Sequence, residues 1–115
     1  YHVFGAMEPF IASHPNTIRA LLRGFVLGLR EAKRDKARAI DALHSRIQMD
    51  PKYAGPTYDD LIDYLFEAGR LPTEKGLEAF FAMGIKAGRF TEPWPRERYW
   101  TPAFADTYAQ WKPPE

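Results

Sequence analysis

The carboxylates that could act together in acid–base chemistry are gathered in one stretch of the chain. Asp59, Asp60 and Asp63 lie close together, and Glu67 follows about one helical turn later. Two neighbouring carboxylates can divide the acid and base roles when one of them is buried beside the other. Here they fall at the expected start of a helix, where acidic residues stabilise the helix dipole. We therefore interpret the group as structural.

Histidine and serine offer no better basis for catalysis. The three histidines are far apart in sequence: His2, His14 and His44. Only Asp41 and His44 are spaced like ligands on one helix face, and such a pair is more often a solvated contact than a metal site. The serines, Ser13 and Ser45, lack the strand–turn–helix context of a nucleophile. We expect no catalytic residue, no metal and no cofactor, and hence no enzyme.

Aromatic and basic side chains alternate near the end of the chain. Pro93 and Pro95 favour an extended segment, so we expect residues 89–101 to form an ordered strap. Arginine stacks on aromatic rings, and aromatic walls line small-molecule sites. The candidate ligand contacts are therefore Arg89, Trp94, Arg96 and Trp100. In the alternative interpretation, the strap only covers the edges of the helices.

Composition limits the classes of protein that remain. The 115 residues are 45% apolar, which is enough for one folded unit over residues 1–115. Sixteen basic residues against fifteen acidic ones leave a net charge of +1, which disfavours a nucleic-acid binder. The chain has no cysteine, hence no thiol chemistry, and no apolar run long enough to span a membrane.

The strongest helical pattern begins at Pro15 and ends at Arg34. Proline is favoured at the first helical position, and basic residues at the end complement the helix dipole. Apolar residues recur on one broad face of this helix: Ile18, Leu21, Leu22, Phe25, Val26 and Leu29. Gly24 and Gly28 lie in the same helix, where we expect them to let another element approach closely.

Further helices are predicted from caps and periodicity. Asp35 caps a helix over Lys36–Ile47, and Gly55-Pro56 forms a turn before Thr57 caps a helix that includes Tyr58–Gly69. Thr73 caps a fourth helix over Gly76–Gly88, in which Gly76, Gly84 and Gly88 serve packing or capping. Thr101-Pro102 begins a last short helix. The only possible strand is Tyr1–Phe4.

The predicted fold is therefore all-α, with about five helices over roughly half of the chain or more. Ten residues on the apolar faces are predicted to form the core: Ile18, Leu22, Phe25, Leu29, Ile40, Leu43, Leu65, Phe66, Phe80 and Phe81.

Several of these segments resemble one known family. Phe10-Ile11 followed by Pro15, Ile18, Leu22 and Leu29 resembles a segment from the last third of the solute-binding proteins of ABC importers, in the nitrate, taurine, sulfonate and thiamine-precursor class. The helices Lys36–Ile47, Tyr58–Gly69 and Gly76–Gly88 resemble the following helices of that family. The similarity extends over about residues 7–110 but consists of apolar patterns.

The resemblance implies a larger parent protein. The chain would be the C-terminal segment of a two-lobed α/β receptor, located in the periplasm, that closes on a small molecule without covalent chemistry and delivers it to an ABC permease. A signal and the first two-thirds of the parent would precede Tyr1. Most ligand contacts would come from that earlier part, and no residue here matches a family binding motif. The isolated segment should leave apolar surface uncovered and form a homo-oligomer such as a dimer.

A second hypothesis needs no ligand. The amphipathic helices and the many aromatic residues also suit a free-standing helical module for protein–protein interaction or oligomerisation. The reading frame upstream of Tyr1 distinguishes the two hypotheses. A secretion signal followed by α/β sequence favours the receptor, whereas a start codon beside Tyr1 favours the module.

Overall fold

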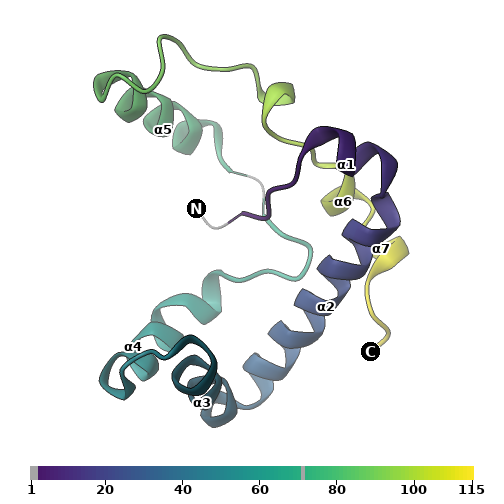
Figure 1. Ribbon diagram of the computed structural model, residues 1–115, viewed down its shortest axis with the longest axis vertical. Helices are drawn as coiled ribbons and strands as arrows, with labels where there is room; N and C mark the ends of the chain where they lie inside the picture. Colours follow the sequence, from purple (N-terminus) through teal and green to yellow (C-terminus); the bar gives the residue numbers. More distant parts are fainter. Residues whose placement is uncertain (1–2, 71) are drawn as a thin grey trace.

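The computed structural model describes residues 3–70 and 72–115, and all the regular secondary structure in these residues is helical (Figure 1). Helices account for 68% of them, and no strand occurs within the described ranges, so the predicted all-α class and helix content are confirmed. Tyr1 and His2, from the possible strand Tyr1–Phe4, lie outside the described residues, while Val3 and Phe4 are not in a strand.

The first two helices follow one another almost without a break. α1 (Glu8–Ser13) is a short helix that was not among the predicted helices, and the Ser13 hydroxyl donates to the Pro9 carbonyl at 2.7 Å. α2 (Pro15–Arg34) has the predicted bounds, with proline at its start and basic residues in its last turn. Its apolar stripe buries Val26 and Leu29.

The third helix also begins and ends as predicted. α3 (Lys36–Ile47) is capped by Asp35, whose side chain accepts from the Arg38 amide at 3.0 Å. It ends at Gln48, which has a left-handed φ of 59°. α3 packs against α4 (Pro51–Leu61) at the bottom of Figure 1.

The predicted start of the fourth helix is wrong. We expected a turn at Gly55-Pro56 and a cap at Thr57, but α4 begins at Pro51 and includes Pro56 in its interior. The cap is Asp50, whose side chain accepts from the Lys52 amide at 3.0 Å. A capping aspartate followed by proline at the first helical position is a stronger start signal than Thr57. The stabilisation from this helix start is larger than the cost of the one backbone hydrogen bond that Pro56 cannot donate.

The earlier start shifts the end of this helix as well. α4 ends at Leu61 and passes into the short 3-10 helix η1 (Ile62–Tyr64), so the predicted helix over Tyr58–Gly69 is only half helical. Gly69 has the expected left-handed φ, at 76°, but it lies in a loop instead of ending a helix. Tyr58 remains within α4, and its hydroxyl donates to the Ala32 carbonyl of α2 at 2.9 Å.

α5 (Glu74–Lys86) has the predicted cap and the predicted end. The Thr73 hydroxyl accepts from the Gly76 amide at 3.1 Å, and Gly88 takes a left-handed φ of 67°. The Arg89 amide donates to the Gly84 carbonyl at 2.8 Å and the Gly88 amide to the Ile85 carbonyl at 2.9 Å, which is the Schellman pattern.

Residues 89–101 follow α5 and carry one short 3-10 helix, η2 (Arg96–Arg98). The single last helix that we expected is divided into α6 (Ala103–Asp106) and α7 (Tyr108–Trp111), each of four residues. Trp111 is buried, and its ring nitrogen donates to the Phe104 carbonyl at 2.7 Å. Figure 1 shows α7 and the C-terminal residues running along α2.

The core is thin. Besides Pro113, five apolar residues are buried within the described ranges: Val26, Leu29, Ala54, Phe81 and Trp111. Of the ten predicted core residues, Leu29 and Phe81 are buried, and six are partly buried: Ile18, Leu22, Phe25, Ile40, Leu43 and Leu65. Phe66 and Phe80 are 41% and 48% exposed, so their assignment to the core is wrong. Phe66 lies in the loop beyond η1 because α4 ends early, and Arg70 stacks over its ring.

The shape of the chain is correspondingly open. The radius of gyration is 16.8 Å, against roughly 13 Å expected for a compact chain of this length. The helices form a curved arrangement in Figure 1, with α5 far from α3 and α4.

Two expectations for the helices can be checked at single residues and over whole helices. A Cβ added at Gly24 or Gly28 would meet no atom of a neighbouring element within 4 Å, so the close approach predicted there is wrong. Among the described helices, none combines the length and the apolar character needed to cross a membrane.

Candidate functional site

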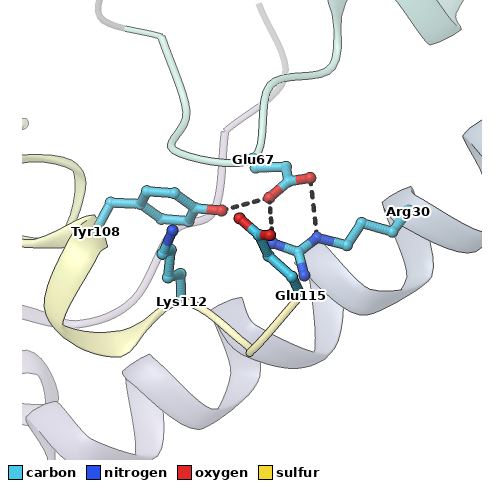
Figure 2. Close-up of a pocket in the computed structure, with 5 residues that line it drawn as sticks. All are labelled: Arg30, Glu67, Tyr108, Lys112 and Glu115. Atoms are coloured by element: carbon cyan, nitrogen blue, oxygen red, sulfur yellow. Dashed lines mark hydrogen bonds and ion pairs between the residues drawn. The ribbon is translucent and has the colours of Figure 1, made fainter.

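Two groups of side chains stand out in the described residues. The first, here called the Arg30 cluster, consists of Arg30, Glu67, Tyr108, Lys112 and Glu115, which line an open pocket of about 520 Å³ (Figure 2). The second, here called the strap pocket, is a smaller space of about 180 Å³ between α5 and residues 93–99.

The Arg30 cluster joins three parts of the chain. Arg30 comes from α2, Glu67 from the loop after η1, and Tyr108 from α7. The Arg30 guanidinium donates to both oxygens of Glu67, at 3.0 Å from Nε and 2.9 Å from Nη2. The Tyr108 hydroxyl donates to the same carboxylate, as Figure 2 shows. Glu67 therefore connects a loop and the C-terminal helix to α2.

The electrostatics of the cluster keep its groups in fixed protonation states. The hydrogen bonds from Arg30, and then from Tyr108, lower the pKa of Glu67 from 4.5 to about 2. The pairing with Glu67 raises the pKa of Arg30, and burial, with the bond to Glu67 second, raises the pKa of Tyr108. Near neutral pH the carboxylate is thus ionised and the phenol neutral. Such a triad holds segments together and is poorly suited to exchanging protons.

The C-terminal residues are attached to α2 by further arginine bonds. Arg30 Nη1 donates to the Pro114 carbonyl at 2.8 Å, and Arg23 Nε donates to the Trp111 carbonyl at 2.9 Å. Pro113 is fully buried. Hydrogen bonds from a charged donor are stronger than those between neutral groups. The cluster therefore fixes the C-terminal residues along α2.

The acidic group at Asp59 to Glu67 is divided between different partners. Asp59 pairs with Lys36 at 2.6 Å, whereas Glu67 pairs with Arg30. Asp59 and Asp60 lie in the last turn of α4 and Asp63 lies in η1, so their predicted place at a helix start is wrong. The cause is the start of α4 at Pro51.

The histidines make local contacts in the described residues. His44 Nδ1 hydrogen-bonds with the Met49 carbonyl at 2.9 Å. The ring of His14 stacks on Phe10 and hydrogen-bonds with the Ser13 hydroxyl at 2.7 Å. Over residues 3–70 and 72–115, no group of three or more potential metal ligands is present.

The four candidate ligand contacts lie in different surroundings. Trp94 and Arg96 both line the strap pocket, where Arg96 pairs with Glu74. Arg89 is exposed and lines neither pocket. Trp100 is partly buried, and its ring nitrogen has no hydrogen-bond partner among the described residues. The structure thus brings together Trp94 and Arg96 but neither Arg89 nor Trp100 of the four candidate ligand contacts.

Sequence reasoning missed the Arg30 cluster. Its hydrogen-bonded residues are separated by 37 and 41 positions, and each has an ordinary local interpretation: Arg30 as a cation near a helix end, Glu67 as one acid among several. Only the tertiary arrangement brings them together. A pattern of complementary charges without fixed spacing carries no signal in a single sequence.

The described residues define an all-α chain with a clamped C-terminus and an aromatic pocket. No protein-family profile, curated protein or solved structure matches the chain. The resemblance to solute-binding proteins accordingly remains a prediction from the sequence.

Proposed function

We propose that this chain is the C-terminal part of a solute-binding protein that delivers a small molecule to an ABC importer. In this role its helices complete the lobes of a two-lobed receptor and support the hinge between them. The receptor captures its ligand without covalent chemistry, works in the periplasm and docks on the permease. The sequence resemblance over residues 7–110 is the origin of this proposal.

The observation that carries the proposal is the amount of apolar surface left uncovered. Met83 of α5 is 70% exposed, and Leu21 and Leu27 of α2 are 58% and 48% exposed. Apolar side chains on amphipathic helices are normally buried against another layer of structure. Apolar faces of helices that nothing covers are places where another layer of structure packs. The remaining lobes of a receptor would provide that layer.

Ligand recognition would fall mainly to those other parts of the receptor. The class binds nitrate, taurine, other sulfonates or thiamine precursors between two lobes, so a ligand held from one side loses most of its buried contact area. Arg89, Trp94, Arg96 and Trp100 remain the candidate contacts from this chain. Among them, Trp94 and Arg96 line the same pocket, where Arg96 is paired with Glu74.

The test compares two proteins by titration calorimetry. The 115-residue chain and the full product of its reading frame are each titrated with nitrate, taurine, other sulfonates and pyrimidine precursors. We expect micromolar binding of one of these classes by the full product and none by the isolated chain. Micromolar binding by the isolated chain would mean that a complete site lies within these residues.

The reading frame itself provides the second check. A secretion signal followed by about 200 residues with an α/β pattern upstream of Tyr1 agrees with the proposal, given the size of two-lobed receptors. A start codon beside Tyr1 would contradict it and favour the free-standing helical interaction module.

A further inference from the structure

The strap pocket combines aromatic rings with carboxylates. Phe81 of α5 is 5% exposed, whereas Trp94 and Tyr99 are 39% and 37% exposed and so keep ring surface open to solvent. The rings of Phe81 and Tyr99 meet edge to face, with centroids 5.6 Å apart and an interplanar angle of 67°. Rings in several orientations around one space are the arrangement by which proteins surround organic cations.

One ring of this pocket already attracts a cation. The guanidinium carbon of Arg98 lies 4.6 Å from the centroid of the Trp94 ring. Arg98 does not line the pocket, and Phe90 packs edge to face against Trp94 with centroids 5.3 Å apart. These two contacts hold Trp94 in place at the pocket. Tryptophan has the strongest cation-attracting ring of the aromatic residues.

The charges around the pocket leave one carboxylate free for a ligand. Glu74 and Arg96 pair with each other. Glu78 also lines the pocket and has no ion-pair partner among the described residues. The pocket lining has two acidic groups and one basic group, and Arg98 adds a second positive charge on the Trp94 ring, so Glu78 is the unpaired carboxylate that would favour a cation. An anion would be repelled by Glu78, whereas a cation would be attracted by Glu78 and by the rings.

We propose that the strap pocket binds a small organic cation of the quaternary ammonium type. Its methyl groups would contact Phe81, Trp94 and Tyr99, and its charge would be balanced by Glu78. The pocket volume of about 180 Å³ is similar to that of a ~150 Å³ cavity that accepts benzene, so a ligand of this size can enter. This proposal does not rest on the function proposed above, since all the residues of the pocket belong to this chain. It assigns Trp94 to an organic cation, whereas the function proposed above counts Trp94 among the candidate contacts for the transported ligand.

The test uses choline and an uncharged analogue in which a tert-butyl group replaces the trimethylammonium group. Each is titrated into the 115-residue chain at constant ionic strength, with tryptophan fluorescence as the readout. We expect choline to saturate with a Kd on the order of 1 mM, because the ligand is small and the pocket is open. The analogue should bind about tenfold more weakly, because it lacks the charge.

Two matched variants locate the binding. Glu78→Gln should weaken choline binding about fivefold and leave binding of the analogue unchanged, since only the charge is removed. Glu92→Gln is the control, because Glu92 is an exposed acidic residue of the strap that does not line the pocket. Equal binding of choline and the analogue, no saturation by choline up to about 50 mM, or equal effects of the two variants would each overturn the proposal.

Discussion

At the scale of single residues, the Arg30 cluster contributes the most specific contacts. Glu67 accepts three hydrogen bonds from two elements that are distant in sequence. A carboxylate that is bonded in the folded state has a lower pKa there than in the unfolded chain. The stability that it contributes is present above its unfolded pKa and is lost as the pH falls toward its folded pKa.

The first prediction uses that dependence. Glu67→Gln should lower the free energy of unfolding by about 1 kcal/mol near neutral pH, after allowance for the partial exposure of the pair. Because the pKa of Glu67 falls from 4.5 to about 2 on folding, the difference from the natural chain should shrink as the pH drops through that interval. Urea midpoints of both proteins at about pH 7 and about pH 3 measure it. A difference that stays constant with pH would contradict the assigned cause.

The second prediction concerns two glycines of opposite surroundings. A Cβ at Gly84 would lie 2.3 Å from the Phe90 ring, so Gly84→Ala should destabilise the chain by ~1–3 kcal/mol. Gly24 has open space around it within α2, so Gly24→Ala should stabilise the chain by ~0.5–1 kcal/mol through helix propensity. Thermal unfolding followed by circular dichroism compares the two. A stabilising effect of Gly84→Ala would show that Phe90 does not pack on Gly84 as described, and a destabilising effect of Gly24→Ala would contradict the open space at Gly24.

At the scale of elements, local signals predict some helices and misplace another. α2 and α3 have the predicted bounds because their caps, apolar stripes and ends agree with one another. The start of α4 is misplaced because Gly55-Pro56 suggests a turn, and Asp50-Pro51 is equally typical of the end of a preceding helix. The path of the strap brings together Trp94 and Arg96, two of the candidate ligand residues. The Arg30 cluster depends instead on contacts across the whole chain, which single-sequence patterns do not encode.

The third prediction tests the start of α4. Asp50→Ala should cost about 1 kcal/mol, because it removes the side chain that accepts from the Lys52 amide. Thr57→Ala should change stability by less than about 0.5 kcal/mol, because Thr57 lies inside the helix and caps nothing. Urea unfolding of the two variants gives the comparison. A larger loss for Thr57→Ala would place the helix start where the sequence alone suggested it.

At the scale of the whole molecule, uncovered apolar surface is the dominant feature. The chain is more extended than a compact protein of its length and leaves large apolar side chains exposed on α1, α2 and α5. Covering such faces is the main source of stability for amphipathic helices. The Arg30 cluster and the clamped C-terminal residues maintain the arrangement of α2, α7 and the loop at Glu67, but they do not cover those faces.

The fourth prediction follows for the chain in isolation. We expect the 115-residue chain to self-associate, as a symmetric or helix-exchanged dimer, through its exposed apolar residues. Met83→Lys on the exposed part of α5 should shift the equilibrium toward monomer, whereas Lys86→Met should not. Sedimentation velocity over a range of concentrations measures this. A monomer at all concentrations would count against the prediction.

The most direct test of the proposed function measures whether the rest of a longer protein covers these helices. Hydrogen–deuterium exchange is recorded for the 115-residue chain and for the full product of its reading frame, and the same peptides are compared. We predict that exchange of α5 amides slows at least about tenfold in the full product, since packing raises the free energy of local opening. Identical exchange of α5 in the two proteins would contradict the claim that these helices complete a larger receptor.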